Sequence, residues 1–171
     1  MLQTGQRAPT FDLPGAGGGR IDRHRLTEYT DNGWAVVLVF YPFDFHPVCT
    51  SRMCTLRDSE ALSLVENTVV LGISTDSVYC HREFADEQRI DFPLLSDSDG
   101  SVAEAYGVLA DEFDDHRGVA CSALFVVDPD RRIQYTWLSD DSEDDPDLAA
   151  VEKAAHCHGD ECTVPDDKSY L

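Results

Sequence analysis

Residues 40–54 read FYPFDFHPVCTSRMC, and the surrounding fold can be worked out from the elements on either side of them. The first letters belong to WAVVLVFYP, residues 34–42, a continuous apolar run rich in β-branched and aromatic side chains. Such a run is typical of a central strand that is buried on both faces. We therefore expect helices to cover this strand.

The residues that follow alternate between helical and strand patterns. Residues 50–66 place apolar side chains among charges at helical spacing, and Thr50 stands where an N-cap or first-turn residue belongs. Residues 68–75, TVVLGIST, predict a second buried strand, and residues 78–89 predict a second helix. Strand, helix, strand and helix in this order indicate a parallel α/β unit with a right-handed crossover.

The second half of the chain predicts shorter elements. Residues 92–100 have the composition of a loop, and residues 101–108 predict a short helix that ends at Gly107. Residues 121–139 hold two apolar runs joined by Asp-Pro-Asp-Arg, which indicates an antiparallel hairpin. A last helix is expected to start near Pro146. The predicted fold class is therefore α/β, with a central mixed sheet flanked by helices.

The length of 171 residues is typical of one domain with its own apolar core. We assign residues 1–153 to that domain and residues 154–171 to a short, polar C-terminal tail. The glycine-rich stretch at 15–19 is expected to be a surface turn. A phosphate-binding loop would need a strand before it and Lys-Ser/Thr after it.

The charge balance excludes several classes of partner. Acidic residues number 33 against 13 basic residues, and the formal net charge of -20 repels nucleic acids and anionic membranes. Acidic residues spread along the chain also suggest a protein that stays soluble in the concentrated salt of a halophile. No secretory signal is visible, and no apolar run approaches the roughly 20 residues that cross a bilayer. We expect a cytoplasmic protein whose six cysteines are not a disulfide framework.

Cys49 is the first candidate for chemistry, because it falls where a buried strand gives way to a helix. Unpaired N–H groups and the helix dipole favour a negative charge at such a position. Pro42 and Pro47 stiffen the connecting loop, and Arg52 lies one helical turn further on, so we expect a lowered thiol pKa. The alternative is an inert buried thiol, since free cysteine is often buried.

Cys54 follows Cys49 by five residues. In an intact helix this spacing separates the two residues by about 7.5 Å along the axis and roughly 140° around it, which prevents a disulfide. A bridge would require the first turns to unwind. The pair then suggests a nucleophile that reacts in the folded helix and a partner that resolves it after opening. The alternative is that Cys54 only packs in the core.

The sequence resembles the peroxiredoxins of the AhpC/TSA superfamily over most of its length. The matching motifs are GQRAPTFDLP, VVLVFYP, FPLLSDSDGSVAEAYGV and ALFVVDPD. The resemblance implies a thioredoxin-like fold and thiol-dependent reduction of hydrogen peroxide or organic hydroperoxides through a cysteine sulfenic acid. It implies no metal or organic cofactor, a thioredoxin-like or other dithiol reductant, and a monomer or homodimer.

The spacing CTSRMC is similar to the peroxiredoxin Q, or bacterioferritin-comigratory-protein, class, in which both cysteines lie on one helix. By this similarity Cys49 is the peroxidatic residue and Cys54 is the resolving residue, which forms an intramolecular disulfide. Together with the acidic composition, the resemblance suggests a halophilic archaeon as the source.

Three positions depart from the family pattern. Pro42 and Cys49 match the catalytic loop, but His46 stands where the family has Thr or Ser. Ser122 occupies the position of an expected arginine, while Arg52 stands where Glu or Gln is common. We therefore hypothesise that Arg52 supplies from the helix the guanidinium that is absent from the strand. An imidazole at 46 can hydrogen-bond a peroxide or a thiolate, and when protonated it would lower the Cys49 pKa further.

Two alternative functions remain open. One is a metal-binding or redox-sensing protein on a peroxiredoxin scaffold, either near Cys49 and His46 or in the tail, because sulfur and imidazole suit zinc or copper. Cys121 lies beside Ser122, but neighbouring residues of a strand point to opposite faces, which weakens a metal site there. The other is a disulfide reductase, disfavoured because C-x-x-C is absent. The weak metal candidates in the tail are His156, Cys157, His158 and Cys162.

Overall fold

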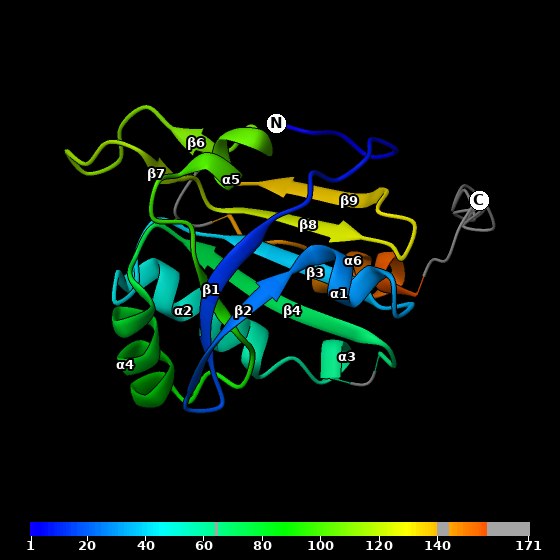
Figure 1. Ribbon diagram of the computed structural model, residues 1–171, viewed down its shortest axis with the longest axis horizontal. Coiled ribbons are helices and arrows are strands. Elements are labelled where there is room, and N and C mark those ends of the chain that lie inside the picture. Colours follow the sequence, from blue (N-terminus) through cyan, green and yellow to red (C-terminus); the bar gives the residue numbers. More distant parts are fainter. Residues whose placement is uncertain (64, 140–143, 157–171) are drawn as a thin grey trace, which may run out of the picture.

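The computed structural model describes residues 1–63, 65–139 and 144–156, and its main feature is one seven-stranded mixed sheet (Figure 1). The strand order is β2-β1-β5-β4-β3-β8-β9. The strands are β1 Asp12–Gly17, β2 Arg20–Arg25, β3 Ala35–Phe40, β4 Thr68–Ser74, β5 Leu94–Ser96, β8 Ala123–Val127 and β9 Ile133–Leu138, and the small hairpin strands are β6 Leu109–Ala110 and β7 Val119–Ala120. The helices are α1 Leu26–Thr30, α2 Pro47–Arg57, α3 Glu60–Ser63, α4 Val78–Gln88, α5 Ser101–Ala105 and α6 Leu148–Ala155.

Strand β3 is the centre of the sheet, as its apolar run predicts, and all six of its residues are buried. It pairs in parallel with β4 and antiparallel with β8. Successive side chains enter opposite cores, because side chains alternate across a strand. One core takes Val36, Leu38 and Phe40, and the other takes Val37, Val39 and Tyr41.

The helices form a layer on each face of the sheet. Buried residues of α1 and α5 join the core that contains Phe40. Buried residues of α2, α4 and α6 join the core that contains Val39. These layers confirm the predicted α/β fold with a mixed sheet. Within the described residues, no helix is long and apolar enough to span a membrane.

The single helix predicted at residues 50–66 is wrong. The structure has α2, which begins at Pro47 with His46 as its N-cap in place of Thr50, and the separate short helix α3. The break falls where Asp58 closes α2 and the Ser59 hydroxyl accepts a hydrogen bond from the Leu62 N–H. Short polar side chains of this kind compete with the helix for backbone groups and favour caps.

The β1–β2 hairpin, the small β6–β7 hairpin and strand β5 are absent from the prediction. The surface turn expected at 15–19 is only partly right. Gly18 and Gly19, with φ of 57° and 75°, form the turn between β1 and β2, whereas residues 15–17 belong to β1, where Gly15 and Ala16 are buried. Strand β2 carries mainly exposed charged residues, so it shows no apolar alternation. The expected loop at 92–100 contains β5, whose three buried residues are too few for a periodic signal.

The packing of α2 against the sheet depends on a glycine. Cys49, Met53 and Leu56 form the buried side of the helix, and fully buried Met53 faces Gly72 of β4. A Cβ atom at Gly72 would lie 2.8 Å from Met53 Cε and 2.6 Å from Leu94 Cδ2. The missing side chain therefore lets α2 approach the sheet closely.

We predict that Met53→Ala lowers the free energy of unfolding by about 2–5 kcal/mol, because it leaves a cavity between α2 and β4. Chemical denaturation measures this change. The matched control is Ser51→Ala on the exposed side of α2, where a change within about 0.5 kcal/mol is expected. Equal effects of the two substitutions would contradict the packing described for Met53.

Candidate active site

The candidate site lies at the carboxyl ends of the parallel strands β3 and β4. The chain leaves β3 at Phe40, passes buried Tyr41, Pro42 and Asp44, and enters α2 at Pro47. His46 has an extended backbone, φ −63° and ψ 130°, which is the conformation that a following proline favours. Pro47 occupies the first helical turn, where the absent N–H costs nothing.

Cys49 lies in the first turn of α2 and is only 2% exposed. Its Sγ atom is 3.6 Å from His46 Nδ1. The sulfur lies on the wall of a pocket of about 280 Å³, which we call the thiol pocket. The lining residues are His46, Val48, Cys49, Arg52, Ala110, Glu112, Phe113, Cys121, Ser122 and Ser139.

The prediction that the surroundings of Cys49 lower its pKa is wrong. Burial raises the pKa of Cys49 above its ordinary value, and the charges of Asp44 and Asp76 raise it further. A hydrogen bond with the Phe43 backbone and the positive charge of Arg52 act in the opposite direction without overcoming burial. The sequence indicates the helix terminus and Arg52, but it does not show how completely the sulfur is withdrawn from water.

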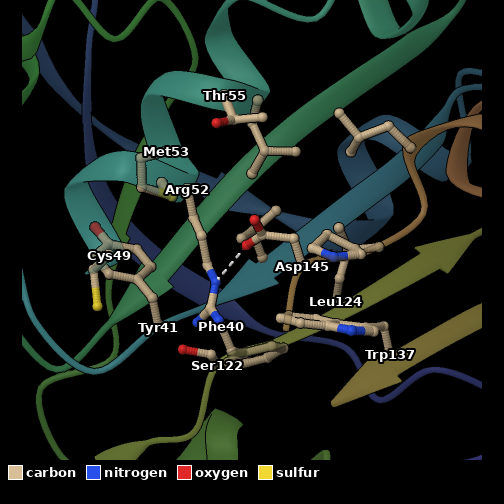
Figure 2. A pocket seen from close by; sticks show the side chains of 14 residues that line it. Phe40, Tyr41, Cys49, Arg52, Met53, Thr55, Ser122, Leu124, Trp137 and Asp145 are labelled. Atoms are coloured by element: carbon tan, nitrogen blue, oxygen red, sulfur yellow. Dashed lines mark hydrogen bonds and ion pairs between the residues drawn. The ribbon is translucent and has the colours of Figure 1, made fainter. Parts of the chain in front are cut away.

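Arg52 lines both the thiol pocket and a smaller pocket of about 80 Å³, whose lining residues are drawn in Figure 2. Its Nε donates to Asp145 Oδ1 at 2.9 Å, and its Nη2 donates to Ser139 Oγ at 3.1 Å. The guanidinium carbon lies 5.3 Å from the centre of the Trp137 ring. These contacts place the charge near Cys49 and Ser122, both of which line the same two pockets.

The hairpin formed by β6 and β7 covers the outer side of the site. Phe113 and His116 bridge its two arms through reciprocal backbone hydrogen bonds of 2.8 Å. The Phe113 ring lies 5.4 Å from the His46 ring, and the His116 ring lies 4.8 Å from the Phe43 ring. Asp114, at the tip, brings Oδ2 within 3.5 Å of His46 Nε2. Sequence reasoning missed Asp114, because no local pattern links this hairpin to α2.

Cys54 faces away from the thiol pocket, toward α4. Its Sγ lies 3.8 Å from Gln88 Oε1 and 3.6 Å from Arg57 Nη1. Arg57 also donates to the Gln88 backbone carbonyl. Both Cys49 and Cys54 are free thiols in this structure. The folded helix thus directs the two sulfurs to different surroundings, which agrees with the separation expected from their spacing.

A buried polar network fixes the loop that leads to Cys49. Tyr41 Oη donates to Asp44 Oδ1 at 2.7 Å, and His81 Nδ1 lies 2.7 Å from Asp44 Oδ2. His81 Nε2 donates to the Leu95 carbonyl oxygen at 3.0 Å, so a proton must also lie between Nδ1 and Oδ2. The His81 and Asp44 side chains are both fully buried. The sequence alone gave no reason to assign a function to His81.

Asp44, Asp76 and Cys80 offer ligand atoms within 4.8 Å of one another, which is a possible metal site. However, both Asp44 oxygens already accept hydrogen bonds, and Asp76 Oδ2 accepts from Ser74 and from the Asp44 backbone. Burial and the two carboxylates raise the Cys80 pKa to about 12. A metal ion at this place would therefore have to displace these hydrogen bonds and a firmly held thiol proton.

The structure changes the interpretation of two other candidates. Cys121 and Ser122 lie between β7 and β8, outside regular strand, so the expectation that they face opposite sides is wrong and both line the thiol pocket. His156 closes α6, and its Nδ1 donates to the Glu152 carbonyl at 3.0 Å. The other tail candidates, Cys157, His158 and Cys162, lie outside the described residues.

Comparisons with known proteins agree with this architecture. Residues 4–136 match the AhpC/TSA family. The chain is 36% identical to a Bcp-type peroxiredoxin of Coxiella burnetii over 139 residues, covering 80% of this chain and 88% of that protein. It is 33% identical to peroxiredoxin Bcp of Bacillus subtilis, with 80% and 85% coverage. The crystal structure of peroxidoxin BcpB from Mycobacterium tuberculosis has a TM-score of 0.74 and 33% identity, covering 91% of this chain and 95% of that one.

A mixed sheet with a buried thiol at the start of a helix, taken together with these matches, places the chain in the class of thiol-dependent peroxidases. The chain belongs to the AhpC/TSA family of peroxiredoxins, and its relatives include the Bcp type. The predicted fold, family and thiol-dependent peroxidase function are therefore confirmed. The metal-binding or redox-sensing alternative is not favoured. The roles of individual residues stay predictions.

We predict that Asp44→Ala lowers the free energy of unfolding by about 3–5 kcal/mol, because it leaves His81 without its partner in a buried site. Thermal or chemical denaturation measures the loss. Asp86→Ala, which removes an exposed carboxylate from α4, is the control and should change stability by about 0.5 kcal/mol or less. A loss for Asp44→Ala no larger than for the control would contradict the anchoring role of this network.

Proposed function

We propose that Cys49 is the peroxidatic nucleophile and Cys54 the resolving thiol of this peroxidase. The Cys49 thiolate attacks a peroxide oxygen and becomes a sulfenic acid, and the Cys54 thiol condenses with it to give a disulfide and water. Pro42, His46 and Arg52 complete the proposed site. The observation that carries this proposal is the position of Cys49 in the first turn of α2, on the wall of an open pocket beside His46 and Arg52.

The position of Arg52 supports the idea that it replaces the family arginine. Ser122 occupies the expected position of that arginine, and it lines both pockets together with Arg52. The Arg52 charge already acts to lower the pKa of Cys49. A guanidinium that enters from α2 can therefore stabilise both the thiolate and the negative charge that develops on the peroxide.

Resolution requires α2 to open. Cys49 packs in the core beneath the helix, while the Cys54 sulfur contacts Arg57 and Gln88 on the side of α4. Because disulfide geometry needs Cα atoms within about 4.4–6.8 Å, the first turns of α2 must unwind before the two sulfurs bond. The proposed cycle thus alternates between a folded helix that reacts with peroxide and an opened helix that forms the bridge.

A dithiol protein is the proposed reductant of this bridge. One relative, from Fasciola hepatica, is a thioredoxin peroxidase that is 32% identical over 148 residues. A thioredoxin-like protein or another dithiol donor would restore both thiols by exchange through a mixed disulfide. Hydrogen peroxide and organic hydroperoxides are the proposed substrates, and the protein is proposed to act as a monomer or homodimer.

We predict that Cys49→Ser abolishes peroxide consumption, because serine lacks a thiolate. Cys54→Ser should still reduce about one equivalent of peroxide and then accumulate a sulfenic acid at Cys49, detected with a dimedone probe and mass spectrometry. Cys80→Ser is the matched control and should turn over normally. Sustained turnover by Cys54→Ser would show that another thiol resolves Cys49. Undiminished consumption by Cys49→Ser would overturn the proposed nucleophile.

We also predict that Arg52→Ala slows the second-order reaction with peroxide by about 10²–10³-fold, the size expected when a transition-state donor is lost. Stopped-flow measurement of a single turnover tests this. Arg57→Ala removes the same charge from the same helix beside Cys54, so it should leave the first step with peroxide nearly unchanged. If both variants react with peroxide at the wild-type rate, Arg52 does not replace the family arginine.

A further inference from the structure

We propose that His46 donates the proton that the leaving oxygen of the peroxide requires, and that Asp114 is the positioning residue that orients the His46 ring. This inference rests on the proposed function, because it concerns the same thiol. It adds an acid catalyst to the site, and it gives a role to a hairpin carboxylate that the sequence does not connect with Cys49.

The geometry that supports this role is a chain of three side chains. His46 Nδ1 lies 3.6 Å from Cys49 Sγ, and His46 Nε2 lies 3.5 Å from Asp114 Oδ2. The two ring nitrogens therefore face a sulfur on one side and a carboxylate on the other. When both nitrogens carry protons, one can point to the thiolate and the other to the carboxylate.

The hairpin holds this arrangement from outside. The Phe113 ring packs against the His46 ring with an interplanar angle of 70°. Asp114 has φ 47°, in the left-handed region, and its carbonyl oxygen accepts a hydrogen bond of 2.6 Å from His116 Nδ1. His46 is one-quarter exposed, so water screens it only in part. The Asp114 side chain is 68% exposed, so its own effect on His46 must be modest.

The proposed step balances in atoms and electrons. A lone pair of the Cys49 thiolate forms an S–O bond with the nearer peroxide oxygen, and the O–O bond breaks. The sulfur loses two electrons and becomes a sulfenic acid, which retains the hydrogen of the attacked oxygen. The other oxygen leaves as an alkoxide or hydroxide and takes the Nδ1 proton of His46, which becomes a neutral imidazole. A solvent proton then restores the imidazolium.

Burial of the thiol explains why a cation is needed next to the sulfur. The pKa of Cys49 is raised by burial and by the charges of Asp44 and Asp76. An imidazolium at 46 opposes these effects and also holds a proton where the leaving oxygen needs one. The family position at 46 carries a hydroxyl, which hydrogen-bonds but does not ionise near neutral pH. The replacement by histidine thus adds acid chemistry at this point of the site.

Several charged groups surround this pair and contribute to its pH dependence. Arg52 approaches from α2, and the hairpin contributes carboxylates and an imidazole. The full set comprises Glu112, Asp114 and His116 from the hairpin, Arg52 from α2, Cys121 from the pocket wall, and Asp44 and Asp76 from the loops after β3 and β4. Because the first step needs a thiolate and a protonated imidazole together, its rate should pass through a maximum with pH.

The first test compares two oxidants that differ in their need for a proton. An alkyl hydroperoxide expels a strongly basic alkoxide, whereas peracetic acid expels acetate, which leaves without protonation. In His46→Asn, a single-turnover reaction with tert-butyl hydroperoxide should slow by about 10²–10⁴-fold, the usual contribution of a general acid. The reaction with peracetic acid should slow much less. Loss of the imidazolium's effect on the thiolate lowers both rates equally, so only the ratio reports proton donation.

The second test concerns the positioning role of Asp114. In Asp114→Asn, the pH–rate curve for hydroperoxide should move to lower pH by a few tenths of a unit, because a negative charge is lost beside the pair, and this is the size expected for an exposed ion pair. Asp115→Asn is the matched control, because it removes the same charge at the neighbouring tip residue and should leave the curve in place. All measurements use the full chain at one fixed ionic strength.

The results separate the inference from the function on which it rests. If His46→Asn slows both oxidants by the same factor, His46 is no proton donor, even though the protein remains a peroxidase. If the curves for Asp114→Asn and Asp115→Asn coincide, Asp114 has no positioning role. If the wild type and Cys49→Ser react equally with both oxidants, the proposed function itself fails.

Discussion

The packing of α2 against the sheet is the constraint on which the site depends. Cys49, Met53 and Leu56 share the buried side of this helix, and Gly72 gives Met53 room against β4. The contact that fixes the Cys49 sulfur also removes it from water and thus opposes its ionisation. In the proposed site, the Arg52 charge on the helix itself opposes this effect, and His46 lies beside the sulfur at the N-cap position.

In the proposed cycle, the same helix must meet two conflicting demands. It has to stay folded while peroxide reacts, since Arg52 reaches the pocket only from the second turn of α2. It has to open when Cys54 approaches the oxidised sulfur. The burial of Met53 and the Arg52–Asp145 contact favour the folded form. The contacts of Cys54 with Arg57 and Gln88 also favour it, because they hold Cys54 away from Cys49. The balance of these contacts sets how often the opened form is visited.

The sequence predicts the parts of this protein that depend on local patterns. The buried strand β3, the presence of a helix soon after it and the candidate Cys49 follow from hydrophobic periodicity and from motifs, although the helix begins at Pro47 and not at residue 50. Contacts between distant segments could not be predicted, because nothing in the local sequence records them. Asp114 contacts His46, which lies 68 residues earlier in the chain, and Asp44, in the loop after β3, contacts His81 of α4. The depth of burial at Cys49 belongs to the same class, so the direction of its pKa shift was wrong.

The acidic composition of the chain opposes the ionisation of Cys49, which the proposed chemistry of the pocket requires. A formal net charge of -20 produces a negative potential that disfavours any thiolate. Concentrated salt shortens the range of that potential to about 3 Å at 1 M, so distant carboxylates lose their effect on Cys49. Arg52 is only 12% exposed and Cys49 only 2%, so the effect of the Arg52 charge on this thiol is screened much less. Salt should therefore leave the nearby Arg52 charge acting on the sulfur while it weakens the opposing field of the distant carboxylates.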